Sequence, residues 1–339
     1  MRPFLRRRLE GVNPMPKMNI VSALNMALDH EMARNEKIVV IGEDVGREGG
    51  VFRVTDGLLE KYGPERVIDT PLSEGGITGT ALGLAAGGLL PVPEIQFEGF
   101  MYLALDQIVN QIARYRTRSR GQYPMNLVIR LPWGGGIRAP EHHSDSPEAV
   151  LVNTPGLTVV QPSNPYDAKG LLTAALRYGD PVIYCEPKRI YRAIKAEVPD
   201  EDYEVPIGKS KVVQEGTDIT IVAWGAMMRE ALKAAQELAA DGVSAEIIDL
   251  MTISPMDSDT IISSVRKTGR LLITHEAPRT GGIGAEIATR VYEEAFTSLL
   301  APVERVTGYD AVMPLFKLEN YYLPNDKKII AGARRLLSY

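Results

Sequence analysis

The sequence predicts an α/β protein built from two domains, and three observations support this prediction. The chain has 339 residues, a length that favours two domains over one. Short runs of β-branched and other apolar residues alternate with longer runs typical of helices. Such alternation indicates a mostly parallel sheet that helices cover on both faces. A segment rich in proline and charged residues separates two such regions, as expected for a connection between domains.

The first domain is expected over residues 18–190. Its longer amphipathic or small-residue runs predict helices at about 19–35, 75–90, 101–119 and 165–178. The apolar runs between them predict strands at 38–41, 66–68, 126–131, 158–160 and 182–184. These strands are expected to form one parallel sheet.

The second domain is expected over residues 205–339, after a linker at 191–204. Its pattern predicts strands at 218–223, 245–249 and 271–274, and helices at 226–241 and 282–299. Residues 1–17 are expected to form a disordered extension. Four arginines in that stretch would also suit a transit peptide, but the lack of serine and the presence of Glu10, Pro14 and Pro16 disfavour this alternative.

Composition argues against several classes of function. The net charge of −5 gives no basic balance that would favour nucleic acid or a membrane surface. No apolar run reaches the ~18 residues that a membrane-spanning helix needs. Cys185 is the single cysteine, so a disulfide within the chain is impossible. A reducing compartment is therefore expected, and we assign the protein to the cytoplasm.

The first candidate site is the segment 69–76, which follows a predicted strand, where ligands of open α/β sheets collect. A helix N-terminus capped by Ser73, with Glu74 in its first turn, is the simpler interpretation. The helix itself is unusual because it is rich in glycine, and each interior glycine costs about 1 kcal/mol relative to alanine. Glycine at these positions suits the close approach of another backbone or a flat ligand.

Two further segments also follow predicted strands. Segment 93–100 places Glu94, Gln96, Phe97 and Phe100 together, a mixture that suits a planar heterocycle but also ordinary packing. Segment 133–144 is a glycine-rich loop that ends in adjacent histidines at positions 142 and 143. A solvated loop is the simpler interpretation there, and the spacing does not suit zinc.

Two other motifs receive structural interpretations. The glycines of segment 281–284 imitate a phosphate-binding loop, but the fingerprint is incomplete and helix–sheet packing is favoured. The basic run from Arg114 to Arg120 is favoured as a solvated helix end or subunit contact over a nucleic-acid site, because the chain is acidic overall.

Seven segments, taken in order, resemble one family. The chain resembles the β subunit of the thiamine-diphosphate-dependent decarboxylase component of the pyruvate, branched-chain 2-oxo acid and acetoin dehydrogenase complexes. The resemblance extends from Asn19 to the C-terminus and rests on segments 42–45, 69–74, 93–97, 106–108, 141–148, 167–172 and 186–188. It implies a first domain that binds the pyrimidine half of thiamine diphosphate, and a second that is similar to the transketolase C-terminal domain.

The resemblance also implies roles for particular residues. Glu74 would share a proton with the aminopyrimidine ring nitrogen and so promote loss of the proton on the thiazolium carbon, which suits a desolvated carboxyl. His143 would face the 2-oxo acid or assist acyl transfer to a lipoyl group. The remaining residues implied to line the cofactor site or join a proton relay are Glu43, Leu72, Gln96 and Phe100. Residues 101–104 are apolar where some relatives carry an acidic residue, which departs from the full relay.

The chain lacks one part of a thiamine site. Thiamine enzymes bind the diphosphate and magnesium through a Gly-Asp-Gly segment, which this sequence does not contain. The resemblance therefore implies a separate α subunit that holds them, a heterotetramer of two α and two β chains, and a lipoyl acyltransferase that docks on the assembly. It further implies that potassium could bind near Ala175, Tyr178 and Asp180, as it does in some relatives.

The sequence leaves more than one possible substrate and more than one possible function. Residues 186–192 resemble branched-chain members more than pyruvate enzymes, so a branched-chain 2-oxo acid is favoured, with pyruvate and acetoin as alternatives. An alternative of another class is a non-catalytic scaffold that only assembles partners. Glu74 argues against it, because a scaffold needs no carboxylate at the start of a glycine-rich helix.

Overall fold

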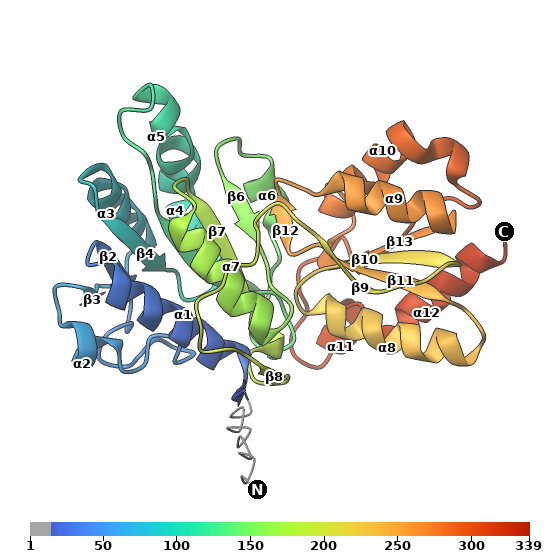
Figure 1. Cartoon of the computed structure of the whole chain (residues 1–339), viewed down its shortest axis with the longest axis horizontal. Helices are drawn as coiled ribbons and strands as arrows, with labels where there is room; N and C mark the ends of the chain where they lie inside the picture. The colour runs from blue at the N-terminus through green and yellow to red at the C-terminus, as the bar shows by residue number, and fades with distance from the viewer. Residues whose placement is uncertain (1–14) are drawn as a thin grey trace, which may run out of the picture.

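The computed structural model describes residues 15–339 and comprises two α/β domains that lie side by side (Figure 1). The first domain contains a seven-stranded sheet in the order β12–β6–β7–β5–β4–β2–β3. All neighbouring strands are parallel except β12, which runs antiparallel to β6. The strands are β2 (Ile38–Gly42), β3 (Val67–Asp69), β4 (Leu90–Glu94), β5 (Val128–Trp133), β6 (Thr158–Val160), β7 (Val182–Pro187) and β12 (Thr252–Ser254).

Helices cover the first sheet, and their ends follow local capping. Asn19 caps the first helix by accepting a hydrogen bond from the Ser22 amide at 3.0 Å. Asn164 caps the seventh in the same way, with Pro165 in its first turn. The helices are α1 (Ile20–Arg34), α2 (Leu58–Tyr62), α3 (Glu74–Ala86), α4 (Met101–Leu105), α5 (Ala113–Arg118), α6 (Glu148–Val152) and α7 (Pro165–Arg177).

Two expected helices differ from the prediction. The helix expected at 101–119 consists of α4, the π-helical segment η2 (Asp106–Ile112) and α5. The helix expected at 75–90 ends at Ala86, because Gly88 adopts a φ of 89° and Leu90 already begins β4. Short 3₁₀ turns η1 (Glu98–Phe100), η3 (Glu141–His143) and η4 (Lys188–Ile190) follow β4, β5 and β7.

The second domain contains a five-stranded sheet in the order β14–β13–β10–β11–β9. Only β9 is antiparallel to its neighbour. The strands are β9 (Lys211–Gln214), β10 (Ile219–Ala223), β11 (Ala245–Asp249), β13 (Leu271–Pro278) and β14 (Glu304–Gly308). The helices are α8 (Met227–Ala240), α9 (Ser258–Thr268), α10 (Ile283–Ala295), α11 (Glu319–Tyr322) and α12 (Asp326–Leu337), with the 3₁₀ turn η5 (Phe296–Ser298) after α10.

The two domains share a sheet and a core. Strand β12 comes from the second half of the chain but pairs with β6, so that Thr252 lies opposite Val160 at the edge of the first sheet. Two large apolar clusters each include buried residues of both domains. The junction is therefore a packed interface, which stabilises one relative placement of the domains.

The N-terminal prediction needs one correction. Lys17–Met18 form a short strand, β1, that pairs with β8 (Ala196–Glu197). Lys17 therefore belongs to the folded chain and not to an extension, because backbone pairing with the connection between the domains holds it. Residues 1–14 lie outside the described part.

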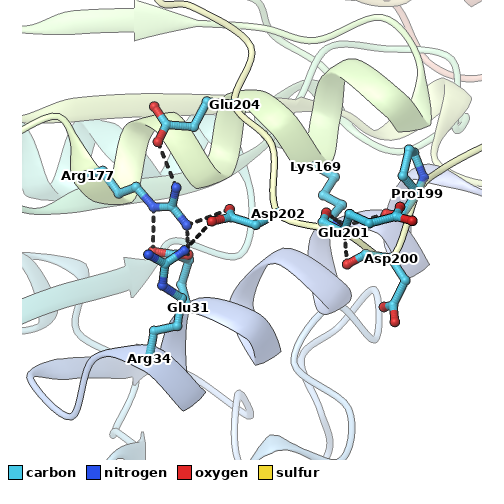
Figure 2. A network of polar contacts seen from close by, with 9 residues as sticks. All are labelled: Glu31, Arg34, Lys169, Arg177, Pro199, Asp200, Glu201, Asp202 and Glu204. Carbon is cyan, nitrogen blue, oxygen red and sulfur yellow. Dashed lines mark hydrogen bonds and ion pairs between the residues drawn. The ribbon is translucent and has the colours of Figure 1, made fainter.

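The connection expected as a linker at 191–204 packs on the first domain (Figure 2). Arg177 on α7 donates hydrogen bonds to Glu31 on α1 and to Asp202 and Glu204 of the connection. Lys169 is buried, and its ammonium donates to backbone carbonyls of the same connection. The segment is thus an ordered strap across α1 and α7. Within the described residues, no helix is long and apolar enough to cross a membrane.

Candidate functional site

The candidate residues gather at one edge of the first sheet. Glu43 follows β2, Glu74 follows β3 and opens α3, Gln96 follows β4, and His143 follows β5. These four strands are adjacent in the order β5–β4–β2–β3, and they are parallel, so their carboxyl ends meet. The site thus forms where open α/β sheets bind their ligands.

Glu74 is held at the N-terminus of α3. Ser73 caps the helix by accepting a hydrogen bond from the Gly76 amide at 3.3 Å. Glu74 is only 4% exposed, and its backbone carbonyl accepts a hydrogen bond from the Thr78 hydroxyl at 2.7 Å. The positive end of the helix dipole favours a carboxylate here.

Glu43 lies beside Glu74, and one of its carboxylate oxygens accepts no hydrogen bond from the described residues. Its Oε1 atom is buried and has no hydrogen-bond partner among the described residues. Burial raises the pKa of Glu43, and the neighbouring carboxylates of Glu74 and Asp44 raise it further. A raised pKa favours the protonated form of the Glu43 carboxyl group. A buried acceptor without a partner also leaves room for a donor group of a ligand.

Aromatic rings surround His143. The centroid of its imidazole lies 4.3 Å from that of Phe97 and 5.2 Å from that of Phe100, both edge to face. Its Nδ1 atom is buried and has no hydrogen-bond partner among the described residues. Burial lowers the pKa of His143, and the charge of Lys188 lowers it further. A neutral imidazole is able to accept a proton at pH 7.

Gln96 and Leu72 stand at the rim of the site. The Gln96 amide donates to the Asp44 carboxylate at 3.3 Å. Leu72 is 77% exposed, and Leu103 on α4 is 67% exposed. An added Cβ at Gly75 would lie 3.2 Å from the carbonyl oxygen of Leu103, so these segments are neighbours. Apolar side chains from both are therefore in water beside the buried carboxyl groups.

The glycines of α3 have different surroundings. Gly75 permits the close approach of the α4 backbone, which is one of the two explanations that the sequence offers for these glycines. An added Cβ at Gly79 would make ordinary contact with Gln107, whereas at Gly83 it would meet nothing within 4 Å. Packing against α4 and η2 thus accounts for one part of the glycine pattern, and a ligand against this helix stays a prediction.

Two buried ion-pair groups support the site, and sequence reasoning missed both. Lys188 donates to Glu98 at 2.5 Å, and its ammonium lies 5.7 Å from the centroid of the Phe97 ring. Arg130 on β5 bridges Glu94 on β4 at 2.6 Å and Glu186 on β7 at 2.7 Å, and all three are buried. An arginine in an otherwise apolar strand was the available signal, because a buried charge needs a partner.

The structure also shows the surroundings of the glycine motif at 281–284 and of the expected potassium position. Added Cβ atoms at Gly282 and Gly284 would lie 2.8 and 2.9 Å from the His275 ring, which confirms close packing in this glycine motif. No group of three histidine, cysteine or acidic side chains in residues 15–339 could hold a metal ion. The expected potassium position stays a prediction: Ala175 is buried, Tyr178 is partly exposed and Asp180 pairs with Arg116.

Comparison with known proteins agrees with this geometry. Residues 16–194 match the family described as "Transketolase, pyrimidine binding domain", and residues 208–329 match "Transketolase, C-terminal domain". A solved "Split gene transketolase, inactive beta4 tetramer" superposes with a TM-score of 0.79 at 26% identity, covering 95% of this chain and 99% of that chain. The fold and these family matches therefore define a protein of the transketolase class.

The sequence relatives are more specific. The chain is 53% identical over 322 residues to "Pyruvate dehydrogenase E1 component subunit beta" of Acholeplasma laidlawii, covering 95% of this chain and 98% of the relative. It is 48% identical over 325 residues to the protein of the same name from Bacillus subtilis, covering 96% and 100%. The chain belongs to the β-subunit family of thiamine-diphosphate-dependent 2-oxo acid dehydrogenase components.

Proposed function

We propose that this chain is the β subunit of a 2-oxo acid decarboxylase component and contributes the pyrimidine half of its cofactor site. The observation that carries the proposal is the pair of buried carboxyl groups, Glu43 and Glu74, at the same sheet edge as His143. When bound, thiamine diphosphate supplies the carbon that adds to the oxo group and accepts the electrons released on decarboxylation.

The residues of this chain would bind and orient that cofactor. Glu74 would hold a proton against the ring nitrogen of the aminopyrimidine, because the carboxyl group is buried and fixed by the first turn of α3. The unpartnered oxygen of Glu43 would accept a further proton in the same pocket. Phe100, Gln96 and Leu72 would line the heterocycle.

His143 would act on the substrate side. Its imidazole is half-buried, neutral by its surroundings and held between two aromatic rings. A neutral imidazole can hydrogen-bond the 2-oxo acid and exchange a proton during transfer of the acyl group to a lipoyl dithiolane.

A partner chain is part of the proposal. The sequence has no Gly-Asp-Gly segment, and the relatives are named as β subunits of an E1 component. We infer an α subunit that holds the diphosphate and magnesium, and that covers the exposed Leu72 and Leu103. The heterotetramer of two α and two β chains and the lipoyl acyltransferase belong to the same proposal.

Pyruvate is the substrate we propose first. The relatives carry the name pyruvate dehydrogenase. The segment that favoured a branched-chain acid includes Glu186 and Lys188, which are buried and bonded to Arg130 and Glu98. Side chains occupied in this way do not reach a substrate, so the branched-chain preference stays a weaker prediction.

Reconstitution tests the proposal. The chain is co-purified with its α subunit, supplied with thiamine diphosphate and magnesium, and assayed on pyruvate, 3-methyl-2-oxobutanoate and acetoin with an artificial electron acceptor. We expect activity on pyruvate, and a loss of about 10²- to 10⁴-fold in Glu74→Gln, the range for a proton-transferring group. The exposed Glu65→Gln serves as the matched control. Full activity in Glu74→Gln would show that Glu74 is not the catalytic carboxyl group. A wild-type assembly that is inactive on all three substrates would favour a non-catalytic scaffold.

A further inference from the structure

The loop that leads to His143 is held by carboxylates of the other domain. The loop begins after β5, at Gly134. The Gly135 amide donates to Glu276 at 3.0 Å. The Gly136 amide donates to Glu319 at 2.7 Å, and the Arg138 amide donates to the same carboxylate at 3.1 Å. Glu276 lies on β13 and Glu319 opens α11, so both belong to the second domain.

The loop depends on these contacts for its conformation. Gly134 and Gly136 adopt φ angles of 80° and 93°, and Arg138 adopts 60°, all in the region that favours glycine. The segment between β5 and η3 has no helix or strand of its own, so its amide groups need acceptors from elsewhere. Glu276 and Glu319 supply those acceptors.

Both carboxylates are buried and accept hydrogen bonds from loop amides, and Glu276 also lies 3.9 Å from the Arg189 guanidinium. Glu319 is 2% exposed and Glu276 is 9% exposed. A hydrogen bond from an amide to a carboxylate is stronger than one between neutral groups. The packing is also close, because an added Cβ at Gly136 would lie 2.4 Å from the Arg189 side chain. Apolar side chains could have filled this junction at a lower desolvation cost, so buried carboxylates indicate a need for fixed amide positions.

We infer that Glu319 and Glu276 are positioning residues for His143 and act through the loop 134–140. This inference rests on the proposed role of His143 in the reaction. The loop joins η3 directly, and η3 contains His143. If the amide contacts are lost, the glycines allow the loop to sample other conformations and the imidazole loses its placement. The second domain thereby sets the geometry of a site that lies on the first.

The contact itself is tested by hydrogen exchange on the full chain. We expect Glu319→Ala to raise amide exchange at Gly136 and Arg138 by about 10-fold or more, because these two amides lose their acceptor. Glu319→Gln has a side chain of the same shape and keeps one acceptor oxygen, so it should retain most of the protection of these amides from exchange. This variant therefore separates loss of the acceptor from general unfolding. Asn320→Ala, an exposed neighbour on α11, is the matched control. Unchanged exchange in Glu319→Ala would overturn the inference.

Kinetics with the α subunit test the positioning role. Glu319→Ala should lower kcat by about 10- to 100-fold, the cost of a small misplacement, with little change in KM for the 2-oxo acid. When Glu319→Ala is added to His143→Ala, kcat should fall no further than in His143→Ala alone. Both substitutions would then remove the action of the same imidazole. If the fold-loss in kcat of the double variant equals the product of the two single losses, Glu319 does not act through His143. Full activity in His143→Ala alone would refute both that role and this inference, whereas the exchange result would still report on the contact.

Discussion

At the scale of single residues, the candidate site combines one carboxyl group with a raised pKa, Glu43, and one histidine with a lowered pKa, His143. Burial and the nearby Glu74 raise the pKa of Glu43. Burial and the charge of Lys188 lower the pKa of His143. When the pKa values of two groups in one site shift in opposite directions, one group is suited to donate a proton and the other to accept one. These directions are consistent with the proton-accepting role that we propose for the His143 imidazole.

The His143 assignment predicts a titration. The imidazole should titrate below the ordinary histidine value of about 6.5. The unfolded chain then takes up this proton first, so His143 makes stability fall as the pH drops from about 6.5 through the folded pKa. Imidazole carbon shifts measured by NMR, and assigned with His143→Gln, give the midpoint. A midpoint at or above 6.5 would contradict the described surroundings.

At the scale of elements, the turn after β4 and the turn after β5 are in direct contact. An added Cβ at Gly99 would lie 2.3 Å from the carbonyl oxygen of His142, a backbone atom that no side-chain motion can move away. Gly99 is therefore required where η1 meets η3. The contact accompanies the packing of Phe97, just before η1, and of Phe100, within η1, against His143 of η3.

This contact predicts a contrast between two substitutions. Gly99→Ala should displace η3, lower kcat of the reconstituted enzyme by about 10- to 100-fold and cost about 1–3 kcal/mol of stability. Gly83→Ala is also a substitution at a helical glycine, but meets nothing within 4 Å, so it should stabilise the chain by about 1 kcal/mol. Activity assays and urea unfolding compare them. Similar behaviour of both variants would refute the steric argument.

The buried arginine predicts a second effect at this scale. Glu186→Ala removes one of the two carboxylates of Arg130 and the acceptor of the Tyr191 hydroxyl. A buried charge left without its partner costs about 3–5 kcal/mol. Urea unfolding should show a loss of this size, whereas the exposed Glu197→Ala should differ from the wild type by less than about 0.5 kcal/mol. A comparably small effect of Glu186→Ala would mean that the ion pair contributes little.

Local pattern predicted some elements and missed others for physical reasons. Ile38–Gly42 is an uninterrupted apolar run and forms β2, and the helix expected at about 19–35 forms α1. Strand β12 has only three residues, and its identity depends on β6, which lies far away in the sequence. The contact between Gly136 and Glu319 spans 183 residues, so no local signal identifies it. The sequence indicated that the candidate residues follow parallel strands, but not the contacts that hold them in place.

At the scale of the whole molecule, the two domains form one packed unit. They share the sheet through β12 and share both large apolar clusters. The second domain also holds the loop that leads to His143. The carboxyl groups lie beside exposed Leu72 and Leu103, a surface that suits another chain. We therefore expect this chain alone to present half of a cofactor site.

Calorimetric titration with thiamine diphosphate and magnesium tests this central claim most directly. The titration is made into this chain alone, into its α subunit alone and into the assembled pair, with Glu65→Gln as the control for Glu74→Gln. The account predicts saturable micromolar binding in the pair and much weaker binding to either chain alone. It predicts that Glu74→Gln weakens binding in the pair. Binding to this chain alone that is as tight as binding to the pair would contradict the account, because the diphosphate would then need no second chain.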